Sequence, residues 1–384
     1  MKILKKILII YIFFFIIKSN YVIASDINSN EIENQTNNFG INSFIENSQN
    51  YTGDFFENIN LKDLFNSAVS GDIDNSIIYK RIINLFFKNI NSSLKTCIYI
   101  LIIIVINSIL KSITDDLGSN NISKMIFYVQ YIAIVTIIMN DFSDIINLVK
   151  NTTNNLVGFM NTLVPIMISI MVYTGSFSTS GVLEPIILFM INFIGNLIQD
   201  IFIPFVLIMI TIAIVSKISD RIQISKISKF MKSTTIWSFG ILLTIFVGVV
   251  SLEGTLSSSV DGVTSKTAKA IVSSAVPVVG KILGDAVDTV LGCTVVLKNA
   301  VGFIGVIIII GICIMPILKL FFITISYKIL SSVCQLIADE KIVDLLEEIG
   351  DVFKILLAIL ISISIMIIIG ITLLLKISNV GFFS

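Results

Sequence analysis

The sequence contains no histidine, and charged residues make up only 14% of it. The absence of histidine excludes Ser-His-Asp and Cys-His catalysis, histidine-ligated zinc or haem, and the usual proton carrier at neutral pH. The net charge is zero, from 26 basic and 26 acidic residues, so no large basic surface can neutralise the phosphates of a nucleic acid. We therefore predict a protein that is not an enzyme and has no nucleic-acid partner.

Motifs that hold metals or cofactors are also missing. The four cysteines lie singly in apolar or small-residue segments, with no pair at metal or redox spacing, and we expect them to be packing residues. They are Cys97, Cys293, Cys313 and Cys334. There is no glycine-rich phosphate loop, nor a dense series of ionisable groups of the kind that proton-coupled pumps use. We predict no metal and no cofactor.

Apolar stretches, by contrast, are abundant. Hydrophobic residues make up 55% of the chain and its mean hydropathy is +0.96. Many stretches approach the roughly 20 residues that a helix needs to cross the hydrocarbon core of a bilayer. We predict an all-α polytopic transmembrane protein with about eight spans after a cleaved signal peptide. The spans are expected at residues 94–110, 125–140, 156–173, 185–199, 201–216, 233–252, 299–318 and 355–375.

The fourth and fifth of these spans are short, and Asp200 and Pro204 lie at their junction. They either cross fully or form a re-entrant hairpin, which is tolerated where protein or water satisfies the backbone. After five spans the loop 217–232 is expected in the cytoplasm. Its five basic residues against one acidic residue agree with the positive-inside rule. The same parity places 253–298 outside, 319–354 inside and the C-terminus outside.

The N-terminus has the features of a secretory signal. Three lysines precede an apolar run over residues 7–17, and small or modest side chains lead up to Ala24. Residues 1–24 are therefore predicted to be a signal peptide, with a retained anchor helix as the alternative. Residues 25–93 are then extracytoplasmic: the asparagine-rich part to about residue 50 is expected to be disordered, and amphipathic helices follow from about residue 55.

The first six expected spans occupy residues 94–252. A segment rich in small residues, 253–298, follows them and precedes the seventh span. The charged residues Lys281, Asp285 and Asp288 fall on one helical stripe. Gly280 and Gly284 have the spacing that allows two helix backbones to approach closely, and Pro277 starts or breaks a helix. The segment is either a membrane-dipping, pore-lining or packing element, to which we add Lys298, or an amphipathic surface helix with a solvated charged face.

This segment resembles the stage III sporulation protein AE family. The resemblance lies in the runs 276–281 (VPVVGK), 285–290 (DAVDTV) and 297–302 (LKNAVG), and the signal peptide followed by a polar outer segment and many spans is similar to that family's layout. It implies a multi-pass component, in the mother-cell membrane around the forespore, of the complex that joins the two cells. It implies no catalytic residue.

The last part of the chain, 299–384, contains the final two spans and, between them, a cytoplasmic segment with helical apolar spacing and an acidic opposite face. An anionic lipid surface would favour a basic helix instead. We expect Glu347, Glu348 and Asp351 either to dock a partner or to form a solvated edge under the bundle.

Taken together, these patterns predict a non-enzymatic component of a transmembrane channel or secretion-like complex in sporulation. The expected partners are the lipid bilayer, other membrane proteins of the same complex and a cytoplasmic secretion-type ATPase. The alternative is a secondary transporter or permease for a small solute, which would have broken helices around a central site.

Overall fold

The structure is a computed structural model that describes residues 29–56, 59–71, 83, 95–113, 120–174, 176–218, 227–228, 230–252 and 279–377. The signal peptide expected at residues 1–24 lies outside these ranges. Every regular element within them is helical, which confirms the all-α prediction.

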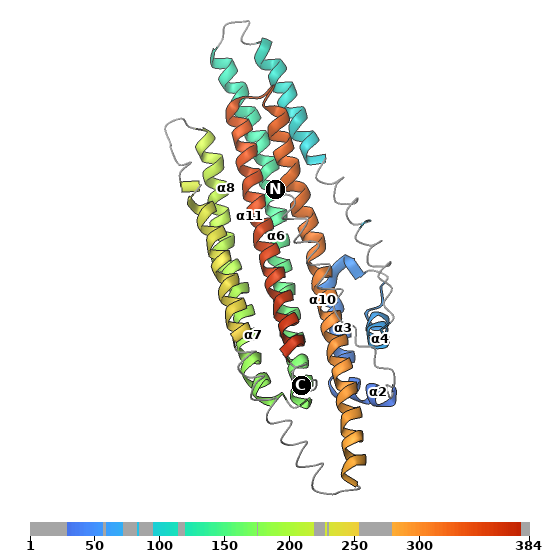
Figure 1. Ribbon diagram of the computed structural model, residues 1–384. Coiled ribbons are helices and arrows are strands. Elements are labelled where there is room, and N and C mark those ends of the chain that lie inside the picture. Colours follow the sequence, from blue (N-terminus) through green and yellow to red (C-terminus); the bar gives the residue numbers. More distant parts are fainter. Residues whose placement is uncertain are drawn as a thin grey trace.

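Long helices run side by side to form an elongated bundle (Figure 1). They are Lys95–Ile113, α6 (Asn120–Tyr173), α7 (Phe177–Leu197), α8 (Ile203–Ile218), Phe230–Leu252, α10 (Val279–Cys334) and α11 (Glu340–Ile377). The short π-helical turn η2 (Ile198–Phe202) joins α7 to α8. Helices α10 and α11 pack against each other and against α6, so these three form the centre of the bundle. In the view of Figure 1, α7 and α8 lie on one side of this centre and the N-terminal helices on the other.

Six helices among the described residues are long and apolar enough to cross a membrane, so the count of eight separate spans is not confirmed. One reason is that α6 joins the second and third expected spans in a single helix of 54 residues. The polar stretch 140–155 separates these two expected spans, but Phe142, Ile145 and Val149 within it are buried at helical spacing. Because this stretch also contains neither glycine nor proline, the helix continues through it.

The fourth and fifth expected spans are likewise one continuous helix, so two separate crossings and the re-entrant hairpin are both wrong. The π-helical turn η2 absorbs the irregularity: the N–H of Ile203 bonds to the carbonyl of Ile198, and Pro204 follows directly inside α8. A π turn widens the helix locally without ending it. The broken helix that a transporter would require here is therefore absent from α7–η2–α8.

The two mergers together remove two crossings, so the sidedness expected for the later loops is unchanged. The end of α8 and the turn between α10 and α11 lie at one end of the bundle, whereas the start of α10 and the end of α11 lie at the other (Figure 1). We call the first the turn end.

The N-terminal region is folded rather than disordered over most of its described length, so the expectation for residues 29–50 is wrong. It forms α2 (Ser29–Asn38), α3 (Ile41–Thr52), η1 (Gly53–Phe56) and α4 (Leu61–Ser70). Gly40, with a φ of 67°, makes the turn between α2 and α3. Few apolar residues are present, but Ile41, Phe44 and Ile45 are buried against the bundle. The free energy gained by burying these side chains offsets the conformational entropy lost on folding, which the composition alone suggested would keep the segment disordered.

Close approaches between helices occur at glycines within the long helices. A Cβ added at Gly305 of α10 would lie 2.8 Å from a methyl carbon of Leu163 in α6. An added Cβ at Gly302 would clash with Leu375 of α11, and one at Gly311 would clash with Phe56 of η1. These glycines allow α10 to contact α6, α11 and η1 at short range.

Candidate functional site

The turn between α10 and α11 brings the acidic face of α11 back alongside the end of α10. The N–H groups of Ile342 and Val343 donate to the carbonyl of Asp339 at 2.9 and 3.2 Å. The hydroxyl of Ser331 on α10 donates to the carbonyl of Val343 at 3.2 Å. These bonds fix the first turn of α11 against the last turns of α10, where free backbone groups need partners.

Lysines from α8 and α10 meet that acidic face. Lys217 of α8 lies 2.8 Å from Asp344 and 3.2 Å from Glu348. Lys328 of α10 lies 2.7 Å from Asp351 and 3.5 Å from Glu347. The side chain of Lys217 is only 15% exposed, so water screens this pair less than it screens an ordinary surface pair.

Two further lysines extend the network around the turn end. Lys232, on the helix Phe230–Leu252, lies 3.3 Å from Asp351. Lys111, at the end of the helix Lys95–Ile113, lies 2.6 Å from Asp339 in the turn itself. The acidic residues between Asp339 and Asp351 thus pair with Lys111, Lys217, Lys232 and Lys328, which lie on four different helices. We call this network the clamp.

The structure therefore places each of the three acids expected to dock a partner in an ion pair within the chain. Sequence reasoning missed these pairs, although it placed the basic loop 217–232 and the acidic segment on the same side of the membrane. Exposure distinguishes the acids: the side chain of Glu347 is 60% exposed, that of Asp351 37% and that of Glu348 20%. Docking by these residues remains a prediction, and Glu347 is the one best presented to a partner.

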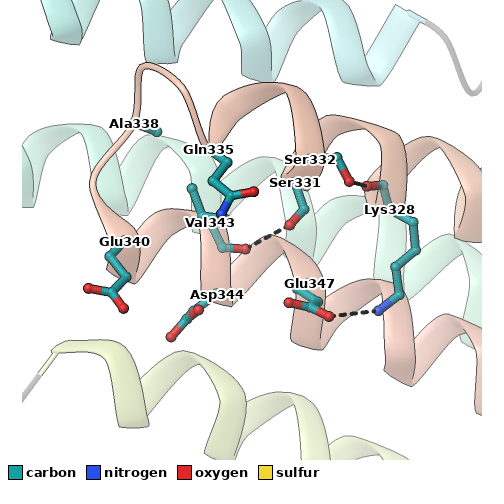
Figure 2. A pocket seen from close by; sticks show the side chains of 9 residues that line it. All are labelled: Lys328, Ser331, Ser332, Gln335, Ala338, Glu340, Val343, Asp344 and Glu347. Atoms are coloured by element: carbon teal, nitrogen blue, oxygen red, sulfur yellow. Dashed lines mark hydrogen bonds and ion pairs between the residues drawn. The ribbon is translucent and has the colours of Figure 1, made fainter.

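A polar groove of about 410 Å³ lies beside the clamp, between α10 and the start of α11 (Figure 2). Its lining residues are Lys328, Ser331, Ser332, Gln335, Ala338, Glu340, Val343, Asp344 and Glu347. Figure 2 shows three carboxylates along one wall, from α11, and Lys328 at one end. Among the described residues no cluster of histidine, cysteine or acidic side chains has the arrangement of a metal site. The side chains that line the groove are suited to hydrogen bonding and to the attraction of a cationic side chain.

At the opposite end of the bundle Lys298 is completely buried between α10 and α11. Its ammonium group donates to the carbonyl of Leu375 at 3.1 Å. Leu375 belongs to the last turn of α11, whose carbonyls lack helical partners and carry the negative end of the helix dipole. Lys298 therefore caps α11 and ties it to α10, which is a packing role.

The other residues of the small-residue segment are only partly within the described structure. Pro277 lies outside it. Gly280, Lys281, Gly284, Asp285 and Asp288 lie on the backbone of α10, which starts at Val279 and continues without a break into the seventh expected span. Their side chains are outside the described residues, so the charged stripe stays a prediction.

Comparison with known proteins extends the geometric description. The family model of stage III sporulation protein AE matches residues 59–378, most of the chain. The chain belongs to this family. The match runs from just before α4 to the end of α11, so it includes both the clamp and Lys298, whereas α2 and α3 precede it.

A curated relative agrees with the family assignment. The chain is 27% identical over 271 residues to stage III sporulation protein AE of Bacillus subtilis (strain 168), an alignment that covers 71% of this chain and 68% of that protein. No solved structure matches the chain. With its apolar helices, the family membership makes this a multi-pass membrane protein of the sporulating cell.

Proposed function

We propose that the chain is a non-enzymatic component of a multiprotein transmembrane channel, or secretion-like complex, that links mother cell and forespore. The family match over residues 59–378 is the observation that carries the proposal. Helix length supports it: α6 and α10, with 54 and 56 residues, are each about 80 Å long at 1.5 Å per residue. A hydrocarbon core of about 30 Å leaves much of both helices available to other proteins.

In the proposed orientation the turn end is cytoplasmic and the start of α10 is outside, in the mother-cell membrane around the forespore. The basic residues of loop 217–232 support this sidedness. A cysteine introduced at Lys226 is expected to react with an impermeant thiol reagent only from the cytoplasmic side. Labelling from the opposite side alone would invert the topology.

The groove at the turn end is the proposed docking site for a cytoplasmic partner, with a secretion-type ATPase as the candidate. Its three carboxylates against one lysine favour a partner that presents a basic segment. Glu347→Lys reverses the most exposed of these charges, and Glu33→Lys, at an exposed position on α2, is the charge-matched control. We expect only Glu347→Lys to weaken capture of the cell's secretion-type ATPase, and equal capture by both variants would leave the groove a packing feature.

The start of α10 is the proposed assembly segment, through Gly280 and Gly284. A leucine at Gly284 would prevent close backbone packing, and Asp285→Ala would remove a partner proposed for Lys281. Both variants are expected to lower recovery of the complex and spore yield, while Ser257→Leu, in the preceding segment, is expected to leave both unchanged. Normal assembly and spore yield from both α10 variants would show that the segment is a solvated surface helix.

A further inference from the structure

The most exposed positions on the N-terminal helices are polar. Every described position that is exposed on α2, α3 and α4 carries a polar or charged residue, and asparagine is the commonest type. On α3 these positions include Glu46, Asn47 and Asn50. The buried face of the same helix is formed by Ile41, Phe44 and Ile45. One face of α3 therefore packs on the bundle and the other is made for water.

Contacts fix the level of this polar face along the bundle. The rings of Phe44 and Tyr51 lie 5.8 and 6.4 Å from the ring of Phe159 on α6. Just after α3, Phe56 packs over Gly311 of α10, which is inside the apolar stretch 299–318. The polar face thus lies beside some of the most apolar helix in the chain rather than beyond its end.

The other side of the bundle presents large exposed phenylalanines at the same level, with the exposed Asn161 and Asn196 beside them. Two residues after Phe159, Asn161 exchanges hydrogen bonds of 2.9 and 3.2 Å with Asn192 of α7. One turn away on α7, Phe189 is 66% exposed, and its ring stacks on that of Phe193. Figure 1 shows α3 and α7 on different sides of the central helices.

These two faces require different surroundings. Exposed phenylalanines suit lipid chains, whereas asparagine and glutamate facing hydrocarbon would lose hydrogen bonds to water with no replacement. Polar residues at membrane depth face protein or a water-filled cavity. A subunit in the wall of a pore has lipid on one side and water on the other. The difference between the two faces is therefore the one expected of such a subunit.

We propose that the exposed face of α3 and α4 is the water-facing wall of an aqueous passage at bilayer depth, on the side of the bundle away from the lipid-facing α7. One chain presents only one such wall, so neighbouring subunits of the complex close the passage. This inference rests on the proposed channel function and assigns its lining to the N-terminal helices.

The test compares two matched cysteines in the full chain, expressed in sporulating cells with its four native cysteines replaced by alanine. Asn47→Cys places a thiol on the polar face, and Phe189→Cys places one on the apolar face at the same level. The probe is a cationic, membrane-impermeant methanethiosulfonate applied to native membranes, because thiols react as thiolates, which need water. Spore yield of each variant shows that it is folded and assembled.

We expect the thiol at position 47 to react many-fold faster than the thiol at position 189. Slow reaction at both positions would place the polar face against lipid or protein and overturn the proposal. Fast reaction at both would place this level outside the bilayer and overturn it as well. Neither result affects membership of the complex, which the assembly and spore-yield measurements on the α10 variants test separately.

Discussion

The close packing of α6 on α7 predicts that a side chain at Gly195 destabilises the protein. A Cβ added there would lie 2.6 Å from Cγ2 of Val157, closer than carbon atoms can approach. Valine has one strongly preferred rotamer in a helix, so the side chain of Val157 cannot turn away. Overpacking of this kind destabilises by about 1–3 kcal/mol, which exceeds the gain of at most about 1 kcal/mol from replacing a helical glycine by alanine. Gly195→Ala should therefore lower the midpoint of thermal unfolding of the purified protein in detergent.

Gly240→Ala is the matched control, because nothing lies within 4 Å of a Cβ added at that helical glycine. It should leave the midpoint unchanged or raise it slightly through helix propensity. Adding Val157→Ala to Gly195→Ala should recover part of the loss, since it removes the methyl group that clashes. Equal midpoints for Gly195→Ala and Gly240→Ala, or no recovery in the double variant, would refute the close contact of α6 with α7.

Two further predictions concern the turn end and its neighbourhood. Lys217→Glu, which sets a third carboxylate beside Asp344 and Glu348, should lower the unfolding midpoint, and adding Asp344→Lys should restore part of it; failure of the exchange to help would remove this pair from the clamp. Tyr327→Phe deletes the 3.0 Å hydrogen bond from the buried phenol to Asp141 and should destabilise by about 1–3 kcal/mol, as loss of a bond to a charged group does; an unchanged denaturation curve would contradict that bond.

The clamp also changes how docking should be tested. Reversing Glu347, Glu348 and Asp351 together would bring new lysines against Lys217, Lys232 and Lys328. Loss of partner binding could then reflect opening of the helix ends rather than loss of a docking contact. Glu347 alone is preferable because its pair, at 3.5 Å, is the longest of the set and its side chain is 60% exposed.

Hydropathy predicted the membrane helices well because each apolar stretch carries its own signal. Hydropathy did not predict which of these stretches join into one continuous helix. The polar composition of 140–155 separates two expected spans, whereas the buried spacing of Phe142, Ile145 and Val149 indicates a continuous helix. The same applies to α3, where Ile41, Phe44 and Ile45 are few but lie on one face. Composition reports an average, and burial depends on the arrangement of a few residues.

The candidate site was less predictable because its contacts join distant parts of the chain. The sequence shows that segment 319–354 is acidic and that loop 217–232 is basic. The pairing of Lys217 with Asp344, however, depends on how α8 and α11 align. Lys298 is a similar case: a lysine within an apolar region suggests a special role, yet only the structure shows the carbonyl of Leu375 as its acceptor. Partners of this kind require the tertiary arrangement.

The central claim, that this chain acts in the mother-cell membrane as a component of the complex that links the two cells, is tested most directly by restoring its gene in one compartment at a time. In a host whose own family member has been deleted, the full chain would be expressed from a mother-cell promoter or from a forespore promoter, and heat-resistant spores counted. We predict recovery of spore formation only from mother-cell expression. Recovery from forespore expression alone would contradict the account.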